Sequence, residues 1–321
     1  MFAASFPVFL LSRVVGGLTE GNVQMSIAMI SDVTEPKTRS RSLAWVGIAF
    51  AAGFSIGPPL GAYLAGFDMR LLLPKWPVNA FSAPALFAFI LIIVETVYMV
   101  LYLPETRPQS TPPVAQSQSD KRTANIASIE SKNVLARLGL VHFIFLFVFS
   151  GMEFTLVFLT FDRFGFSNMQ QGYLLAFVGV FSALIQGGYV RRMAHKVGER
   201  RLVIQGIASC SIGLFIIGVS ERTELLYLGA VFLSFTSGTV VTSLTALASM
   251  SQAKVGMGRA LGSFRSAGQL GRALGPVSAC TAYWVFGSTR AYLSASLALL
   301  VLVICTHILI PKQQKQDAKQ D

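Results

Sequence analysis

The chain has few charged residues, few cysteines and few histidines, and each shortage excludes a class of protein. Only 13% of its 321 residues are charged while 53% are hydrophobic, so it cannot form a single water-soluble domain with an ordinary surface. Its three cysteines and three histidines show no paired or clustered spacing, which predicts neither a disulfide framework nor a metal site. The sequence also lacks a phosphate-binding Gly-x-x-x-x-Gly-Lys loop, a zinc-protease motif and a serine-nucleophile motif. We therefore expect neither an enzyme nor a cofactor.

Long apolar runs are what the chain has instead. A membrane-spanning helix needs roughly 20 mostly apolar residues, and nine segments meet this requirement. They lie at about 6–31, 43–67, 80–103, 137–161, 170–190, 202–220, 225–250, 259–286 and 289–310. The sequence therefore predicts an all-α fold, a polytopic bundle of membrane helices.

Lysines and arginines gather in alternate loops between these spans. If the loop at 32–42 is cytoplasmic, that side holds 18 of the 26 basic residues and the opposite loops hold five. The positive-inside rule then places the C-terminus in the cytoplasm. The net charge of +11 reflects this topology and contact with anionic membrane lipids, not binding of nucleic acid. The plasma membrane and an internal membrane both stay open as the location.

One motif occurs twice, at positions 218 residues apart (271 minus 53). A Gly-x-x-x-Gly-Pro sequence begins at Gly53 and again at Gly271, each time inside an apolar span. Glycines four residues apart let a neighbouring helix approach closely, and a proline after them kinks the helix. The residues of this conformational motif are Gly53, Gly57, Pro58, Gly61, Gly271, Gly275 and Pro276.

The repeat and the polar segment 104–136 divide the chain. We expect an incomplete N-terminal bundle at 1–103, a disordered cytoplasmic linker at 104–136, a six-helix bundle at 137–310 and a cytoplasmic tail at 311–321. The repeated motif lies in the fifth of six spans in the second half and in the second of three spans in the first half. A complete relative is therefore expected to have twelve spans in two six-span halves, and this chain would begin near the fourth.

Several of these features resemble the major facilitator superfamily. The motif from Gly53 to Gly61 is similar to that of its drug/proton antiporter branch, and Arg13, with two glycines three and four residues later, fits the start of its fourth helix. The stretches 137–192 and 265–276 are similar to the animal tetracycline transporter-like members of the superfamily. The resemblance implies a membrane transporter of small organic solutes, drug-like molecules or organic anions, coupled to protons as an antiporter that works by alternating access.

Ionisable residues inside the predicted spans are the candidates for binding, because burying a charge in the membrane is costly. Arg265 and Arg272 lie seven residues apart on one face of a helix, with Gln269 between them. Two fixed cations suit an anionic substrate, since guanidinium groups match carboxylate geometry. The alternative is an internal ion pair with Glu153 or Glu95 that locks two helices together.

Carboxyl groups at membrane depth are the candidates for proton coupling. Glu153 follows the predicted start of its span by sixteen residues, and Glu95 lies near mid-depth. An apolar environment favours the neutral form of a carboxyl group, so each can carry a proton. The family resemblance also gives Arg13 a part in proton coupling. For both glutamates the alternative is a structural ion pair with an arginine.

Two other classes of protein compete with a transporter. One is a truncated, non-transporting isoform or gene-model fragment that inserts in the membrane without moving a solute. The other is a membrane scaffold or receptor, which the matched half-repeats favour less. The sequence does not predict an oligomeric state.

Overall fold

The computed structural model describes residues 6–19, 26, 29, 30, 33, 34, 49, 52, 53, 56–67, 69, 82–104, 121–190, 192, 193, 197–250 and 257–310. The chain divides into two compact units. One unit is Met1–Ala115 with Asn168–Ala176, and the other is Gln116–Ser167 with Phe177–Asp321.

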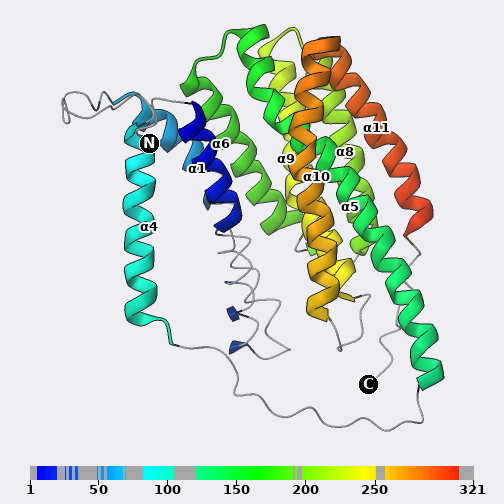
Figure 1. Cartoon of the computed structure of the whole chain (residues 1–321). Helices are drawn as coiled ribbons and strands as arrows, with labels where there is room; N and C mark the ends of the chain where they lie inside the picture. The colour runs from blue at the N-terminus through cyan, green and yellow to red at the C-terminus, as the bar shows by residue number, and fades with distance from the viewer. Residues whose placement is uncertain are drawn as a thin grey trace. The chain divides into compact units, whose positions relative to one another are not determined.

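Every element within the described ranges is a helix, which confirms the predicted all-α fold (Figure 1). A π-helical segment, η3 (Ile185–Val190), continues α6. The α-helices are α1 (Phe6–Thr19), α4 (Ser82–Tyr102), α5 (Lys121–Phe164), α6 (Asn168–Leu184), α8 (Glu199–Val219), α9 (Thr223–Met250), α10 (Met257–Phe286) and α11 (Ser288–Leu309).

Six described stretches are long and apolar enough to cross a membrane, and each coincides with a predicted span. They are Ser82–Tyr102, Asn133–Phe164, Asn168–Val190, Glu199–Val219, Thr223–Ala248 and Ser288–Leu309. Helix α10 has the length, with 30 residues, but its arginines and glycines make it less apolar. Helix α1, with 14 residues, covers the first part of the predicted span at 6–31. Much of the predicted span at 43–67, and the predicted tail at 311–321, lie outside the described residues.

Helix α5 begins earlier than the sequence predicts. The segment 104–136 is expected to be a disordered linker, whereas α5 starts at Lys121 and runs for 44 residues to Phe164. The prolines of this segment all precede residue 114, and no proline or glycine follows until Gly139. Because proline is the residue that excludes a helix most strongly, a helix can form once the proline-rich part has ended.

Small and hydroxyl-bearing residues let α8 pack closely on its neighbours α9 and α11. A Cβ atom at Gly213 would lie 3.0 Å from the carbonyl oxygen of Gly229 on α9. Ser211 on α8 donates to the carbonyl oxygen of Ser296 on α11 over 2.8 Å, and Ser296 donates back to Ser211 over 2.7 Å. Close approach and satisfied hydroxyl groups are how helices associate in a membrane.

Arg163, in the last turn of α5, joins the ends of three helices. Its guanidinium group donates to three carbonyl oxygens at the end of α8 over 2.9–3.3 Å and to two hydroxyl oxygens at the start of α11 over 2.9 and 3.0 Å. The last carbonyl groups of a helix lack partners within the helix and attract a cation. The acceptors are Ile217, Gly218, Ser220, Ser288 and Thr289.

In the N-terminal unit, residues 56–65 are helical and contact the start of α6. A Cβ atom at Gly172 would lie 3.2 Å from Cβ of Ala62 and 3.4 Å from the carbonyl oxygen of Pro58. The absence of a side chain at Gly172 therefore lets α6 pack against the helical residues 56–65, which include the later part of the first copy of the repeated motif. Met69 and Ala83 form a small buried cluster in the same unit.

Candidate functional site

The candidate site lies where α5 and α10 run side by side (Figure 1). Near the start of α10, the carbonyl oxygen of Phe264 is 3.3 Å from Nδ1 of His142, which lies in the middle of α5. Near the ends of both helices, the hydroxyl group of Tyr283 on α10 donates to Asp162 Oδ2 on α5 over 2.8 Å. Because later residues of α5 contact later residues of α10, the two helices are parallel.

Glycines bring the two backbones into contact. A Cβ atom at Gly275 would collide with the carbonyl oxygen of Phe147 on α5. A Cβ atom at Gly271 would collide with the carbonyl oxygen of Phe143 on the same helix. A Cβ atom at Gly151 on α5 would lie 2.7 Å from Cβ of Ala279 and 2.8 Å from the carbonyl oxygen of Gly275. The second copy of the repeated motif therefore forms the close helix contact that its sequence predicts.

The surface of α10 is divided into stripes that follow its 3.6-residue turn. One stripe is buried against α5 and consists of Phe264, Gly268, Gly271, Gly275 and Ala279. The next stripe, one residue further at each turn, carries the polar positions Arg265, Gln269 and Arg272. The opposite side is apolar and exposed, with Leu270, Leu274 and Val277. The three predicted substrate residues therefore share one face, which borders the contact with α5.

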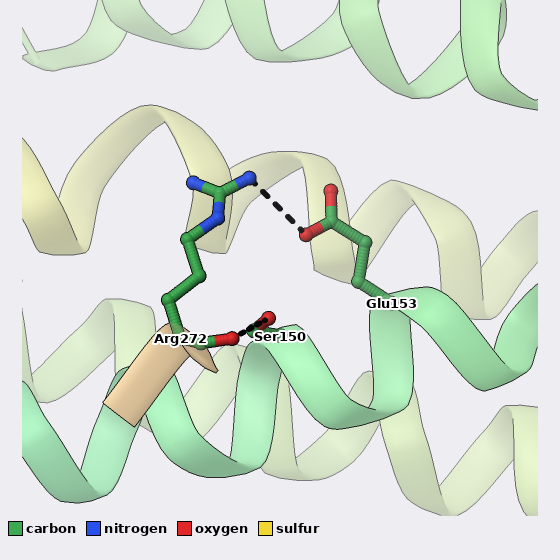
Figure 2. Close-up of polar contacts among 3 residues, drawn as sticks. All are labelled: Ser150, Glu153 and Arg272. Carbon is green, nitrogen blue, oxygen red and sulfur yellow. Dashed lines mark hydrogen bonds and ion pairs between the residues drawn. The ribbon is translucent and has the colours of Figure 1, made fainter. Parts of the chain in front are cut away.

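Glu153 of α5 lies opposite Arg272 (Figure 2). Glu153 Oε2 and Arg272 Nη2 are 4.0 Å apart, and the side chains are 28% and 46% exposed, respectively. Below the pair, the Ser150 hydroxyl group donates to the carbonyl oxygen of Arg272 over 3.2 Å, which fixes this turn of α10 against α5. A separation of 4.0 Å is an ion pair but exceeds the length of a direct hydrogen bond.

The remaining predicted residues lie as follows. Arg265 is half-buried and Gln269 is exposed. Glu95 lies on α4 and is exposed, as is Arg13 on α1, whose guanidinium carbon is 5.2 Å from the ring centroid of Phe9. Among the described residues, nothing lies within 4 Å of the Cβ positions of Gly53, Gly57 and Gly61, the first-copy glycines. Pro58 is half-buried, and Pro276 lies inside α10.

Sequence reasoning missed the parts of the contact that depend on how the helices pair. His142 is 4% exposed and its ring stacks on Phe264 with centroids 4.4 Å apart. Its Nε2 atom has no hydrogen-bond partner in the described part of the chain. No metal-ligating residue lies near His142 in the sequence, and Ser150 belongs to no motif. Nothing in the sequence around either residue therefore predicts its contact with α10.

Apolar spans, glycine-mediated packing and an arginine–glutamate pair between two of the helices are the features of a polytopic helical membrane protein. The family model of the Major Facilitator Superfamily matches residues 1–276. The chain belongs to the major facilitator superfamily, as its sequence motifs predict.

Relatives of more than 30% identity match almost the whole chain. The human protein called major facilitator superfamily domain-containing protein 10 is 34% identical over 96% of this chain and 69% of its own length. A crystal structure of the human organic anion transporter MFSD10 (TETRAN) has a TM-score of 0.72 and 32% identity, covering 95% of this chain and 72% of that one. A bacterial homologue of the lysosomal transporter Spinster, at 14% identity and a TM-score of 0.61, shares the fold. The chain thus spans about two-thirds of the length of the curated relative.

Proposed function

We propose that the protein transports small organic anions across a membrane, coupled to the movement of protons, by alternating access. The observation that carries this proposal is the contact between Arg272 and Glu153 beside the polar stripe of α10. The relative described as a human organic anion transporter supports the class of substrate. Drug-like solutes are the wider class, since a tetracycline resistance protein from Escherichia coli is 23% identical over 84% of the chain.

Among the described residues Arg272 pairs with Glu153 alone, and this leaves guanidinium donors for a substrate anion. A guanidinium group carries five N–H donors and cannot lose its charge at ordinary pH. Its contact with Glu153 is 4.0 Å long and its side chain is 46% exposed, so the pair leaves room for a second anion. Gln269 and Arg265 on the same stripe would add hydrogen bonds to a carboxylate or sulfonate group.

The predicted coupling is antiport, in which protons move opposite to the solute. The ion pair also favours a second candidate, symport, because an ionised Glu153 competes with a substrate anion for Arg272. Protonation of Glu153 removes that competitor, and by linkage a bound anion favours protonation of Glu153. Proton and anion would then occupy the site together and move in the same direction.

Movement between the two orientations would use the Gly-x-x-x-Gly-Pro helices. The contact of Gly271 and Gly275 with α5 holds the second half together as a unit. If the first copy makes the equivalent contact within its own half, each half can move as a rigid body during transport. Substrate binding and protonation would each favour one orientation.

The test is uptake of a radiolabelled aromatic sulfonate into vesicles that contain the purified protein. A sulfonate stays ionised throughout the pH range used, so a pH gradient alone does not move it. Accumulation driven by an acidic interior indicates antiport, and accumulation driven by an acidic exterior indicates symport. Dissipating the gradient with an ionophore should abolish accumulation in either case.

Glutamine variants test which carboxyl group carries the proton. Glu153→Gln should remove the dependence on the gradient while exchange of sulfonate across the membrane persists, since a neutral amide cannot carry a proton. Glu95→Gln tests the alternative carrier, and Glu224→Gln, in the exposed first turn of α9, is the matched control. Saturable uptake that responds to neither gradient would contradict the coupling, and the absence of saturable uptake would contradict transport itself.

A further inference from the structure

A cavity lies between the first turn of α8 and the last turn of α11, away from the α5–α10 contact. Its volume is ≈ 350 Å³, and its lining consists of Arg200, Arg201, Ile204, Gln205 and His307. Both helices are apolar enough to cross a membrane, from Glu199 to Val219 and from Ser288 to Leu309. The cavity therefore lies at the ends of two spans, at the depth where phospholipid headgroups meet a membrane protein.

The polar side chains that line the cavity are hydrogen-bond donors. Arg200 Nη2 donates to the carbonyl oxygen of His307 over 2.5 Å, which anchors the guanidinium group to α11. Arg200 Nε is buried and has no partner among the described residues. Gln205 Oε1 accepts a hydrogen bond from the Tyr189 hydroxyl group over 3.2 Å, and the two N–H donors of its amide nitrogen have no partner in the described part of the chain.

The charge around the cavity is positive. Arg200 and Arg201 both carry permanent charges, and Arg201 is exposed. Gly198, the N-cap of α8, has a φ of 85° and supplies no capping side chain, so the partial positive charge of the helix end adds to the two arginines. The acidic residue of this turn, Glu199, is not among the described residues that line the cavity.

We propose that this cavity binds the phosphate group of an anionic phospholipid in the surrounding leaflet. A guanidinium group can donate two hydrogen bonds to two oxygens of one phosphate. The cavity has the volume of about twelve water molecules, which accommodates a phosphate with part of its glycerol. The side on which the cavity lies is the one that the basic-residue count predicts to be cytoplasmic, where the leaflet is anionic. Ile204 supplies an apolar wall for the carbon chain of the lipid.

The experiment compares lipids on the purified full chain in detergent. Phosphatidylglycerol and phosphatidylcholine are added at equal total lipid, and retained lipid is counted by native mass spectrometry while the melting temperature is followed. Phosphatidylglycerol should be retained preferentially and should raise the melting temperature. Arg201→Gln should weaken its binding roughly tenfold, as expected for one lost charged hydrogen bond. Arg222→Gln, just before the start of α9 at the other end of α8, is the matched control and should bind as the parent does.

A comparison with inorganic phosphate distinguishes a lipid headgroup from a free phosphate ion as the bound group. Inorganic phosphate at millimolar concentration should give a much smaller shift than phosphatidylglycerol; an equal shift would overturn the lipid assignment in favour of a soluble anion. Equal retention of the two lipids would also overturn it, as would an Arg222→Gln effect as large as that of Arg201→Gln. Arg200→Gln removes the bond to α11 as well, so a loss of binding counts as support only if Arg201→Gln, which keeps that bond, also weakens binding.

Discussion

Replacing Arg272 with glutamine separates a substrate-binding role from a purely structural one. At 4.0 Å and an effective dielectric constant of about 20, the Coulomb attraction to Glu153 is at most about 4 kcal/mol. The side chains are 46% and 28% exposed, so solvent reduces the net contribution to about 1 kcal/mol or less. Breaking a fully buried pair would instead cost about 3–5 kcal/mol. We therefore expect Arg272→Gln to lower the melting temperature by only about 2–4 °C.

Binding should respond much more strongly than folding. Loss of one hydrogen bond from a charged group costs about 1.5–3 kcal/mol, which weakens affinity for an anionic substrate about ten- to a hundredfold. A neutral drug-like substrate should be affected far less. The assay measures the melting temperature and the KM for one sulfonate and one neutral solute, for Arg272→Gln, Glu153→Gln and the double variant. A large drop in melting temperature with an equal loss for both solutes would refute the binding role and leave a structural lock.

Three further changes test the rest of the molecule. Gly275→Ala forces a Cβ atom into the backbone of α5 and should destabilise the protein by about 1–3 kcal/mol, whereas Gly262→Ala on the same helix meets nothing within 4 Å and should not, as thermal unfolding would show. Arg163→Gln removes donors to five acceptors at the ends of α8 and α11 and should destabilise by about 2 kcal/mol or more in the same assay; an unchanged melting temperature would mean that solvent replaces these bonds. In intact cells, an impermeant thiol reagent should label a cysteine introduced at Asn168 and spare one at Ser117, and the reverse pattern would invert the orientation.

Six of the nine spans and the close helix contact could be predicted from the sequence, because both depend on local composition. Twenty apolar residues specify a membrane helix whatever surrounds them, and Gly271 with Gly275 predicts that some helix comes close. Which helix does so could not be predicted, since the contact with α5 joins residues more than 120 positions apart. The sequence left Glu153 and Glu95 as possible partners of Arg272, and the parallel pairing of α5 with α10 places Glu153 there.

Other features follow from tertiary packing alone. Arg163 looks like an ordinary charge at a helix end, and only the meeting of α5, α8 and α11 gives it five acceptors. His142 has no sequence neighbour that explains its burial, because its partner Phe264 comes from α10. The early start of α5 at Lys121 is a local property, because no proline or glycine lies between residues 114 and 138 and a helix can form there despite the polar composition.

The most direct test of an anion site on the polar stripe of α10 is protection of a cysteine at position 269 from a thiol reagent. Gln269→Cys lies between Arg265 and Arg272, and Leu274→Cys on the opposite, apolar face is the matched control, both in a background without the native cysteines. An organic anion should slow modification at position 269 in a saturable way, with half-protection at its transport KM, and leave position 274 unchanged. If the anion does not slow modification at position 269, or slows it equally at both positions, the result would contradict an anion site on this face of α10.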